Sequence, residues 1–216
     1  MRITIVYDNE IYQQNIGLVK DWGFSCLIEI DNEKILFDTG AKGEILINNL
    51  NKLKIEPETI TKIIISHEHW DHNGGLEKLS PLVKNVELYR FEKQKKYNNM
   101  KNKDSEKLQK ITDNVFTTGR LPGEPVDEQS LILKQKNDYY VITGCSHSKV
   151  KNILKHAEKH GKIKGLIGGL HGFNEFDILK DLEIIIPCHC TKHIKEIKKL
   201  YPDKTEDGGV GKIINF

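Results

Sequence analysis

A string of histidines and acids directly follows a short apolar run, and it constrains the fold more than any other feature of the chain. Residues 63–76 read IIISHEHWDHNGGL, in which three β-branched residues suit a strand buried on both faces. In extended backbone, side chains two residues apart point the same way, so His67 and His69 can present their imidazoles to one metal ion. Asp71 and His72 follow where the chain leaves the strand, and they can turn toward a second ion. The sequence therefore predicts a metal site at this strand end, with a merely polar loop as the alternative.

Strand and helix patterns alternate along the chain, as in an α/β protein. Short apolar or alternating runs predict strands at residues 2–7, 24–30, 33–37, 63–65, 131–133, 139–143, 166–167, 184–186 and 213–214. Apolar residues at helical spacing predict helices at residues 42–53, 150–157, 174–182 and 192–200. Sheets with helices packed outside them form a layered α/β domain.

One domain over residues 1–216 is the expectation for a chain of this length. A charged insertion at about residues 92–113 interrupts it, because charged and amide side chains fill most of residues 92–110. We expect this segment to be exposed, helical or disordered, and without a core of its own. It is either a lid over an anionic substrate or a solvated loop.

Composition excludes several classes of protein. Lys and Arg total 33 against 31 for Asp and Glu, and a formal net charge of +2 argues against nucleic acid as a general partner. Four cysteines are too few for a disulfide scaffold, and no signal-peptide pattern opens the chain. No apolar stretch is long enough to span a membrane. We therefore expect a reduced, cytoplasmic protein with no membrane partner.

The His-x-His-x-Asp-His string after a buried strand resembles the signature of the metallo-β-lactamase superfamily, and the resemblance covers most of the chain. It implies a four-layer αββα sandwich with two divalent metal ions at one edge of the sheets. Residues 35–40 read ILFDTG and are similar to the family's earlier Asp-Thr-Gly element. Asp38 would then orient the metal loop, because ligand imidazoles need their other N–H group held. The alternative is an aspartate that only starts a tight turn.

The family also requires a further histidine, a bridging aspartate and a last histidine, and three segments after predicted strands offer histidines. They are TGCSH at residues 143–147, GGLHG at residues 168–172 and PCHCT at residues 187–191. The resemblance implies that one ion is held by His67, His69 and His147, and the other by Asp71, His72 and His189. His171 is either a ligand or a group that faces the substrate, and we favour the substrate.

The sequence departs from the family at the bridging aspartate, whose expected position holds Cys145. Either Cys145 is a thiolate ligand, or His147 supplies the contact, or the second ion binds weakly; an inert buried thiol is the remaining possibility. A thiolate would favour zinc or iron over manganese. Alternation at a strand end would point Cys188 and Cys190 away from the side that His189 uses, so we interpret both as structural cysteines.

A set of further motifs resembles one branch of the superfamily, the dihydropterin ribofuranosylaminobenzene phosphate synthase-like or dihydropteroate-synthase-like proteins. Besides the three histidine segments, these motifs are YDNE at residues 7–10 and GVGK at residues 209–212. Asp8 either contributes to the metal pocket or caps the turn after the first strand. Lys212 either receives a substrate phosphate together with its glycine-rich backbone or lies in a plain turn.

Two divalent ions about 3.5–4 Å apart lower the pKa of a bridging water and clamp the oxygens of a displacement, which is the chemistry of hydrolysis. We expect a metal-dependent hydrolase that uses a metal-bound hydroxide on a small, anionic phosphoester or phosphodiester, pterin- or nucleotide-like. Asp71 and His171 are the candidate catalytic groups, and zinc is the favoured ion, with iron or manganese as alternatives. A lactonase or thioesterase, or a non-hydrolytic metal or redox protein, are the other hypotheses.

Overall fold

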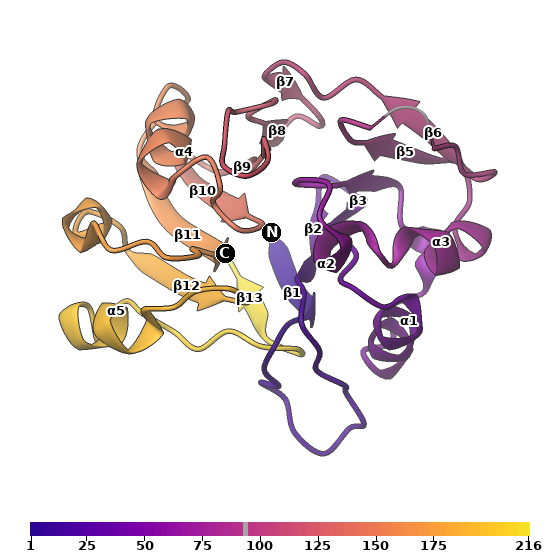
Figure 1. Cartoon of the computed structure of the whole chain (residues 1–216), viewed down its shortest axis with the longest axis horizontal. Coiled ribbons are helices and arrows are strands. Elements are labelled where there is room, and N and C mark those ends of the chain that lie inside the picture. Colours follow the sequence, from indigo (N-terminus) through magenta and orange to yellow (C-terminus); the bar gives the residue numbers. More distant parts are fainter. Residues whose placement is uncertain (93–94) are drawn as a thin grey trace. The chain divides into compact units, whose positions relative to one another are not determined.

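The computed structural model describes residues 1–92 and 95–216, and the chain divides into two compact units (Figure 1). The N-terminal unit comprises residues 1–106 and 208–216, and the C-terminal unit comprises residues 107–207. Each unit is built on one mixed β-sheet, and the two are described in turn.

The N-terminal unit pairs an antiparallel half-sheet with a parallel one. Its described strands are β1 (Arg2–Tyr7), β2 (Ser25–Ile30), β3 (Glu33–Phe37), β4 (Lys62–Ile64), β5 (Val86–Tyr89), β6 (Met100–Lys103) and β13 (Ile213–Asn215), in the order β13-β1-β2-β3-β4-β5-β6. Its described helices are α1 (Gly43–Lys52), α2 (Trp70–Asn73) and α3 (Leu76–Leu79), with the 3₁₀ turns η1 (Pro57–Thr59) and η2 (Ser80–Leu82). Because β3, β4, β5 and β6 run parallel, the loops that follow them emerge at one edge of the sheet.

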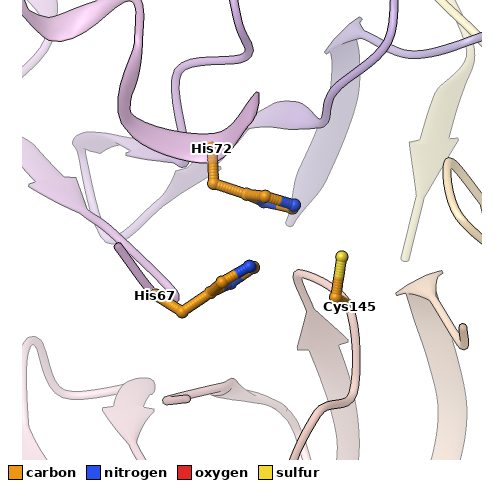
Figure 2. Close-up of side chains that lie close together, drawn as sticks. All are labelled: His67, His72 and Cys145. Atoms are coloured by element: carbon orange, nitrogen blue, oxygen red, sulfur yellow. The ribbon is translucent and has the colours of Figure 1, made fainter. Parts of the chain in front are cut away.

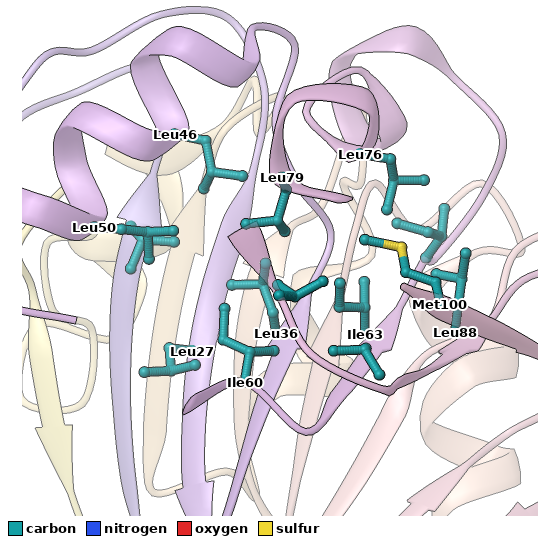
Figure 3. Close-up of a cluster of buried hydrophobic side chains, with 14 of the residues drawn as sticks. Leu27, Leu36, Leu46, Leu50, Ile60, Ile63, Leu76, Leu79, Leu88 and Met100 are labelled. Atoms are coloured by element: carbon teal, nitrogen blue, oxygen red, sulfur yellow. The ribbon is translucent and has the colours of Figure 1, made fainter. Parts of the chain in front are cut away.

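Helices α1 and α3 cover one face of this sheet (Figure 3). Leu46 and Leu50 of α1 and Leu79 of α3 are fully buried and pack with Leu36 and Ile63 of the strands. Burying a leucine of this kind stabilises the fold by about 1.5–3 kcal/mol, so this cluster fixes the sheet beneath the histidine loop.

The predicted hairpin between β2 and β3 is confirmed. Asp31 and Asn32 form its turn with φ of 54° and 61°, the left-handed conformation that two-residue hairpins require and that asparagine and aspartate tolerate. The closing strand predicted at residues 213–214 is also confirmed, and Ile214 pairs with Ile3 of β1.

The C-terminal unit contains the second sheet. Its described strands are β7 (Gln109–Lys110), β8 (Val115–Thr117), β9 (Leu131–Gln135), β10 (Asp138–Thr143), β11 (Ile163–Gly169) and β12 (Ile184–Cys188), in the order β12-β11-β10-β9-β8-β7. The described helices are α4 (Val150–Ala157) and α5 (Ile194–Leu200), with the 3₁₀ turn η3 (Phe176–Leu179). Strands β10, β11 and β12 are parallel, so the three loops that carry the later histidines leave from the same sheet edge.

Two secondary-structure expectations are wrong. The charged segment at about 92–113 is neither helical nor disordered where it is described: β6 pairs with β5, and β7 pairs with β8. Both are edge strands, where charged side chains are tolerated because one side faces solvent. The part of the prediction that falls on residues 93–94 lies outside the described residues.

The helix predicted at 174–182 is only the short 3₁₀ turn η3. Phe176, Leu179 and Leu182 recur every three residues, which matches the three residues per turn of a 3₁₀-helix, and both leucines are buried. The other predicted helices are confirmed as α1, α4 and α5. Within the described ranges, no helix has both the length and the apolar character that crossing a membrane requires.

Candidate metal centre

The predicted histidine string forms a compact cluster in the N-terminal unit. His67 and His69 follow β4, and their facing ring nitrogens, Nε2 and Nδ1, are 3.0 Å apart. The rings of His67 and His72 are inclined at 46° to each other, with centroids 4.2 Å apart, and Figure 2 shows the two side chains. Asp71 completes the set, with Oδ2 3.9 Å from His72 Nε2. The structure thus brings together the four donors that the sequence predicts.

The donor set of this cluster fits a divalent metal. Two imidazole nitrogens bound to one zinc ion at about 2.05 Å in tetrahedral geometry would be about 3.3 Å apart, close to the separation of the His67 and His69 nitrogens. Three imidazoles with one carboxylate are also ligands that zinc, iron and manganese accept. His67 with His69 could therefore contribute to one ion and Asp71 with His72 to another, and their role as ligands stays a prediction.

Asp38 holds the histidine loop from the neighbouring strand end. Its carboxylate is fully buried after β3, and Oδ2 lies 2.7 Å from His72 Nδ1. Oδ1 accepts the backbone N–H of Ser66 at 2.7 Å, and Oδ2 accepts the Ser66 hydroxyl at 2.8 Å. Burial raises the pKa of Asp38, while His72 and Ser66 act in the opposite direction. This geometry suits the orienting role predicted for Asp38, since it directs His72 Nε2 as the ring nitrogen that could bind a metal ion.

Glu68 and Arg90 form an ion pair behind the same loop, and the sequence reasoning missed both residues. Arg90 follows β5 and is only 2% exposed; its Nε donates to Glu68 Oε1 at 3.1 Å, and its Nη2 donates to Oε2. Glu68 also accepts the side-chain amide of Asn73 at 3.0 Å, which ties the loop to helix α2. The only local signal was an acid between two histidines, because Arg90 lies 22 residues downstream.

Trp22 is a second residue that the sequence reasoning missed. It is 50% exposed, and its indole Nε1 donates to Asp71 Oδ2 at 2.8 Å. This bond orients the Asp71 carboxylate, whose oxygens can each accept more than one hydrogen bond.

In the C-terminal unit, a buried glutamate organises the loop that follows β10. Glu128 Oε1 accepts the backbone N–H groups of Gly144, Cys145 and Ser146 at 3.0, 2.8 and 3.1 Å, and Oε2 accepts that of His147 at 2.6 Å. Four consecutive N–H groups thus converge on one carboxylate, in the manner of a backbone anion nest. Sequence reasoning missed Glu128, since nothing local distinguishes it from the acids around it.

The cysteines of this unit adopt an arrangement that the strand-alternation argument did not predict. Cys145 lies in the loop after β10 (Figure 2), and its Sγ is 3.3 Å from Sγ of Cys190. The prediction that Cys190 points away from His189 is wrong, because His189 has a φ of 48° and ends the extended backbone at Cys188. Ligand atoms of Cys145, His189 and Cys190 all lie within 4.8 Å of one another. Cys188 stays in β12, with its thiol directed at the Ile186 carbonyl.

His147 and His171 lie beside a cavity of about 300 Å³ in the C-terminal unit. Their ring centroids are 5.2 Å apart, and His147 Nδ1 lies 3.2 Å from the Glu124 carbonyl oxygen. His171 is exposed, with a φ of 47° that turns it out of the strand direction of β11. Lys149 also lines the cavity. His147 and His171 therefore face a space suited to a small ligand.

Asp8 and Lys212 lie in the N-terminal unit. Asp8 is buried, and its Oδ1 accepts the backbone N–H of Glu10 at 3.0 Å, which is the turn-capping arrangement. Lys212 is buried, with Nζ 4.4 Å from the centre of the Tyr12 ring and 3.4 Å from its hydroxyl. The roles of both residues at a site stay predictions.

Comparisons with known proteins agree with the sequence signature. The family model of the metallo-β-lactamase superfamily matches residues 23–159. An uncharacterized protein of Methanocaldococcus jannaschii is 31% identical over 99% of this chain and 100% of its own length. From the same organism, the 7,8-dihydropterin-6-methyl-4-(β-D-ribofuranosyl)-aminobenzene-5′-phosphate synthase is 26% identical over 90% of each chain.

A solved structure supports the same assignment. Tm1679, described as a metal-dependent hydrolase of the β-lactamase superfamily, aligns with a TM-score of 0.78 at 26% identity and covers 100% of this chain and 99% of its own. The predicted fold class, the metallo-β-lactamase fold with two mixed sheets and their helices, is confirmed. The chain belongs to the metallo-β-lactamase superfamily.

Proposed function

We propose that the chain is a metal-dependent hydrolase of small phosphoesters or phosphodiesters. The observation that carries the proposal is the cluster of His67, His69, Asp71 and His72, held by the buried carboxylate of Asp38. A divalent ion bound there would supply hydroxide at neutral pH and polarise the bond to be cleaved. Two ions are proposed, with zinc preferred and with His147 and His189 as the further ligands predicted from the sequence.

Residues of the chain have separate tasks in this proposal. Asp38 keeps the His72 ring oriented through Nδ1, and Glu68 with Arg90 keeps the loop in place. Asp71, oriented by the Trp22 indole, would take up the proton of an attacking water as a general base. These residues therefore fix geometry and proton position around the reacting bond.

The cavity beside His171 could hold a small phosphorylated substrate. Its volume of about 300 Å³ is at the lower end for small-molecule sites, and Lys149 and His171 line it together with Glu124 and Glu175. The Lys149 ammonium and an imidazole N–H of His171 would donate hydrogen bonds to a phosphate group. The 26% identical relative named for a dihydropterin 5′-phosphate product also favours a phosphorylated, pterin-like substrate.

The test is a substrate panel with purified protein reconstituted with zinc or manganese. We expect turnover of bis-p-nitrophenyl phosphate that chelation abolishes and metal restores. His69→Ala should lower the rate by at least about 100-fold, equivalent to about 2.7 kcal/mol of transition-state stabilisation. The matched control is His156→Gln, since His156 lies on helix α4. Turnover that survives chelation would refute the proposal, and turnover of p-nitrophenyl acetate or lactones alone would replace it with carbonyl-ester hydrolysis.

A further inference from the structure

The loops after β10 and β12 bring two thiols and an imidazole together in the C-terminal unit. Sγ of Cys145 and Sγ of Cys190 are 3.3 Å apart, and an imidazole nitrogen of His189 lies within 4.8 Å of both sulfur atoms. All three residues are buried. Cys145 and Cys190 are 45 residues apart in the sequence. The parallel pairing of β10, β11 and β12 brings their two loops to the same edge of the sheet.

The surrounding backbone is shaped to permit this contact. A Cβ at Gly169, on the strand between the two loops, would lie 2.8 Å from Cys190 Sγ, so a glycine is needed there. The φ of 48° at His189 turns Cys190 toward Cys145. In the other loop, the backbone N–H of Cys145 donates to Glu128 Oε1, which fixes the backbone at Cys145. Three separate features thus converge on one placement of the two sulfur atoms.

The sulfur separation matches shared ligation of a metal better than it matches a disulfide. Two thiolates bound to a zinc ion at about 2.3 Å in tetrahedral geometry are about 3.8 Å apart. A disulfide needs about 2.05 Å. From 3.3 Å, the first arrangement requires a change of about 0.5 Å and the second a change of about 1.2 Å.

We propose that Cys145, Cys190 and His189 form a thiolate-rich metal site that binds zinc or another thiophilic divalent ion and discriminates against magnesium and manganese. On binding, each thiol loses its proton to solvent and forms one metal–sulfur bond, so the two thiolates neutralise the charge of the ion. That balance suits a buried site, where a net charge is costly. The proposal deepens the proposed function, because it adds two thiolates to His189, which is already proposed as a ligand of the second ion. It rests on the proposed function for what that ion does in hydrolysis, whereas the thiolate contacts come from the C-terminal unit.

Cobalt(II) provides the test, because a cobalt–thiolate bond gives an intense charge-transfer absorption that nitrogen and oxygen ligands do not give. Metal-free, reduced protein should develop this band on cobalt addition, and zinc but not manganese should displace it. Cys190→Ser and Cys145→Ser should each lose about half of the band and at least about tenfold in cobalt affinity. Cys188→Ser and Cys26→Ser are the matched controls, since these buried thiols lie in β12 and β2, and both should keep the band.

A cobalt spectrum without the charge-transfer band, or a band unchanged in Cys190→Ser, would overturn the proposal. Should the serine variants fail to fold, X-ray absorption of the zinc-loaded wild-type protein decides the matter. It should show sulfur at about 2.3 Å from zinc, and a shell of nitrogen and oxygen alone would refute the site. Hydrolysis is read separately: a thiolate band without phosphoester turnover would leave this site standing and refute only the proposed function.

Discussion

Glu128 should be the residue on which the conformation of the 144–147 loop depends. Its carboxylate accepts four backbone N–H groups and the Thr143 hydroxyl, and all five donors are buried. Leaving a buried donor without an acceptor costs about 1 kcal/mol or more. Four N–H groups at about 1 kcal/mol each predict that Glu128→Ala lowers the free energy of unfolding by about 4 kcal/mol.

Glu128→Gln separates charge from shape. The amide keeps one oxygen for Gly144, Cys145 and Ser146, but its NH₂ group would face the N–H of His147, so one bond is lost and the others lose their charge assistance. We expect a cost of about 2 kcal/mol, between wild type and the alanine variant. Glu158→Ala, an exposed glutamate at the end of α4, is the control and should stay within about 0.5 kcal/mol of wild type.

The assay must report on the C-terminal unit. Both tryptophans, Trp22 and Trp70, lie in the N-terminal unit, so fluorescence does not serve. Urea unfolding of metal-free protein by circular dichroism, with hydrogen exchange of residues 144–147, measures the effect directly. A loss of 4 kcal/mol would speed exchange of these amides by about a thousandfold. A loss below 1 kcal/mol in Glu128→Ala, or equal losses in both variants, would refute the reasoning.

Three further predictions concern single side chains. Asp38→Asn removes the carboxylate that orients the adjacent imidazole, so zinc affinity measured by chelator competition should fall 10–100-fold. Arg90→Met removes the cation paired with Glu68, and urea unfolding followed by tryptophan fluorescence should show a loss of about 2–4 kcal/mol in the free energy of unfolding; an unchanged midpoint would contradict this. Gly168→Ala places a Cβ 1.9 Å from a backbone oxygen at a φ of 120° and should cost more than about 3 kcal/mol in thermal or urea unfolding, whereas Gly172→Ala, with open space around it, should be neutral.

The features that the sequence predicts well are those set by short-range pattern. The string from His67 to His72 follows a β-branched strand, and alternation alone places its first two imidazoles on one side. For Asp38 the sequence allows both an orienting group and a turn residue, and the 2.7 Å contact of its carboxylate with His72 favours the first. The loop that carries Asp38 and the histidine loop meet because the parallel strands β3 and β4, which precede them, end at the same edge of the sheet.

The features that the sequence does not predict depend on contacts between distant segments. Arg90 and Glu128 look like ordinary charged residues until the fold buries them beside Glu68 and the 144–147 loop. Cys190 was misplaced for a different reason: a single left-handed residue, His189, reverses the side to which the next side chain points. Alternation holds only while the backbone stays extended, and PCHCT carries no glycine to mark the change.

In each unit, a buried carboxylate holds a loop that carries candidate metal ligands. A ligand loop must be rigid if its donors are to converge on an ion, yet a loop has few backbone bonds of its own. In each unit a buried carboxylate from another segment supplies them: Asp38 binds the Ser66 N–H and the His72 ring, and Glu128 binds the loop of Cys145. These bonds come from protein groups alone, so an ion would not have to order the loops. Most of the free energy of the metal–ligand bonds would then contribute to affinity. Substitution of either carboxylate should therefore lower the affinity for the metal ion.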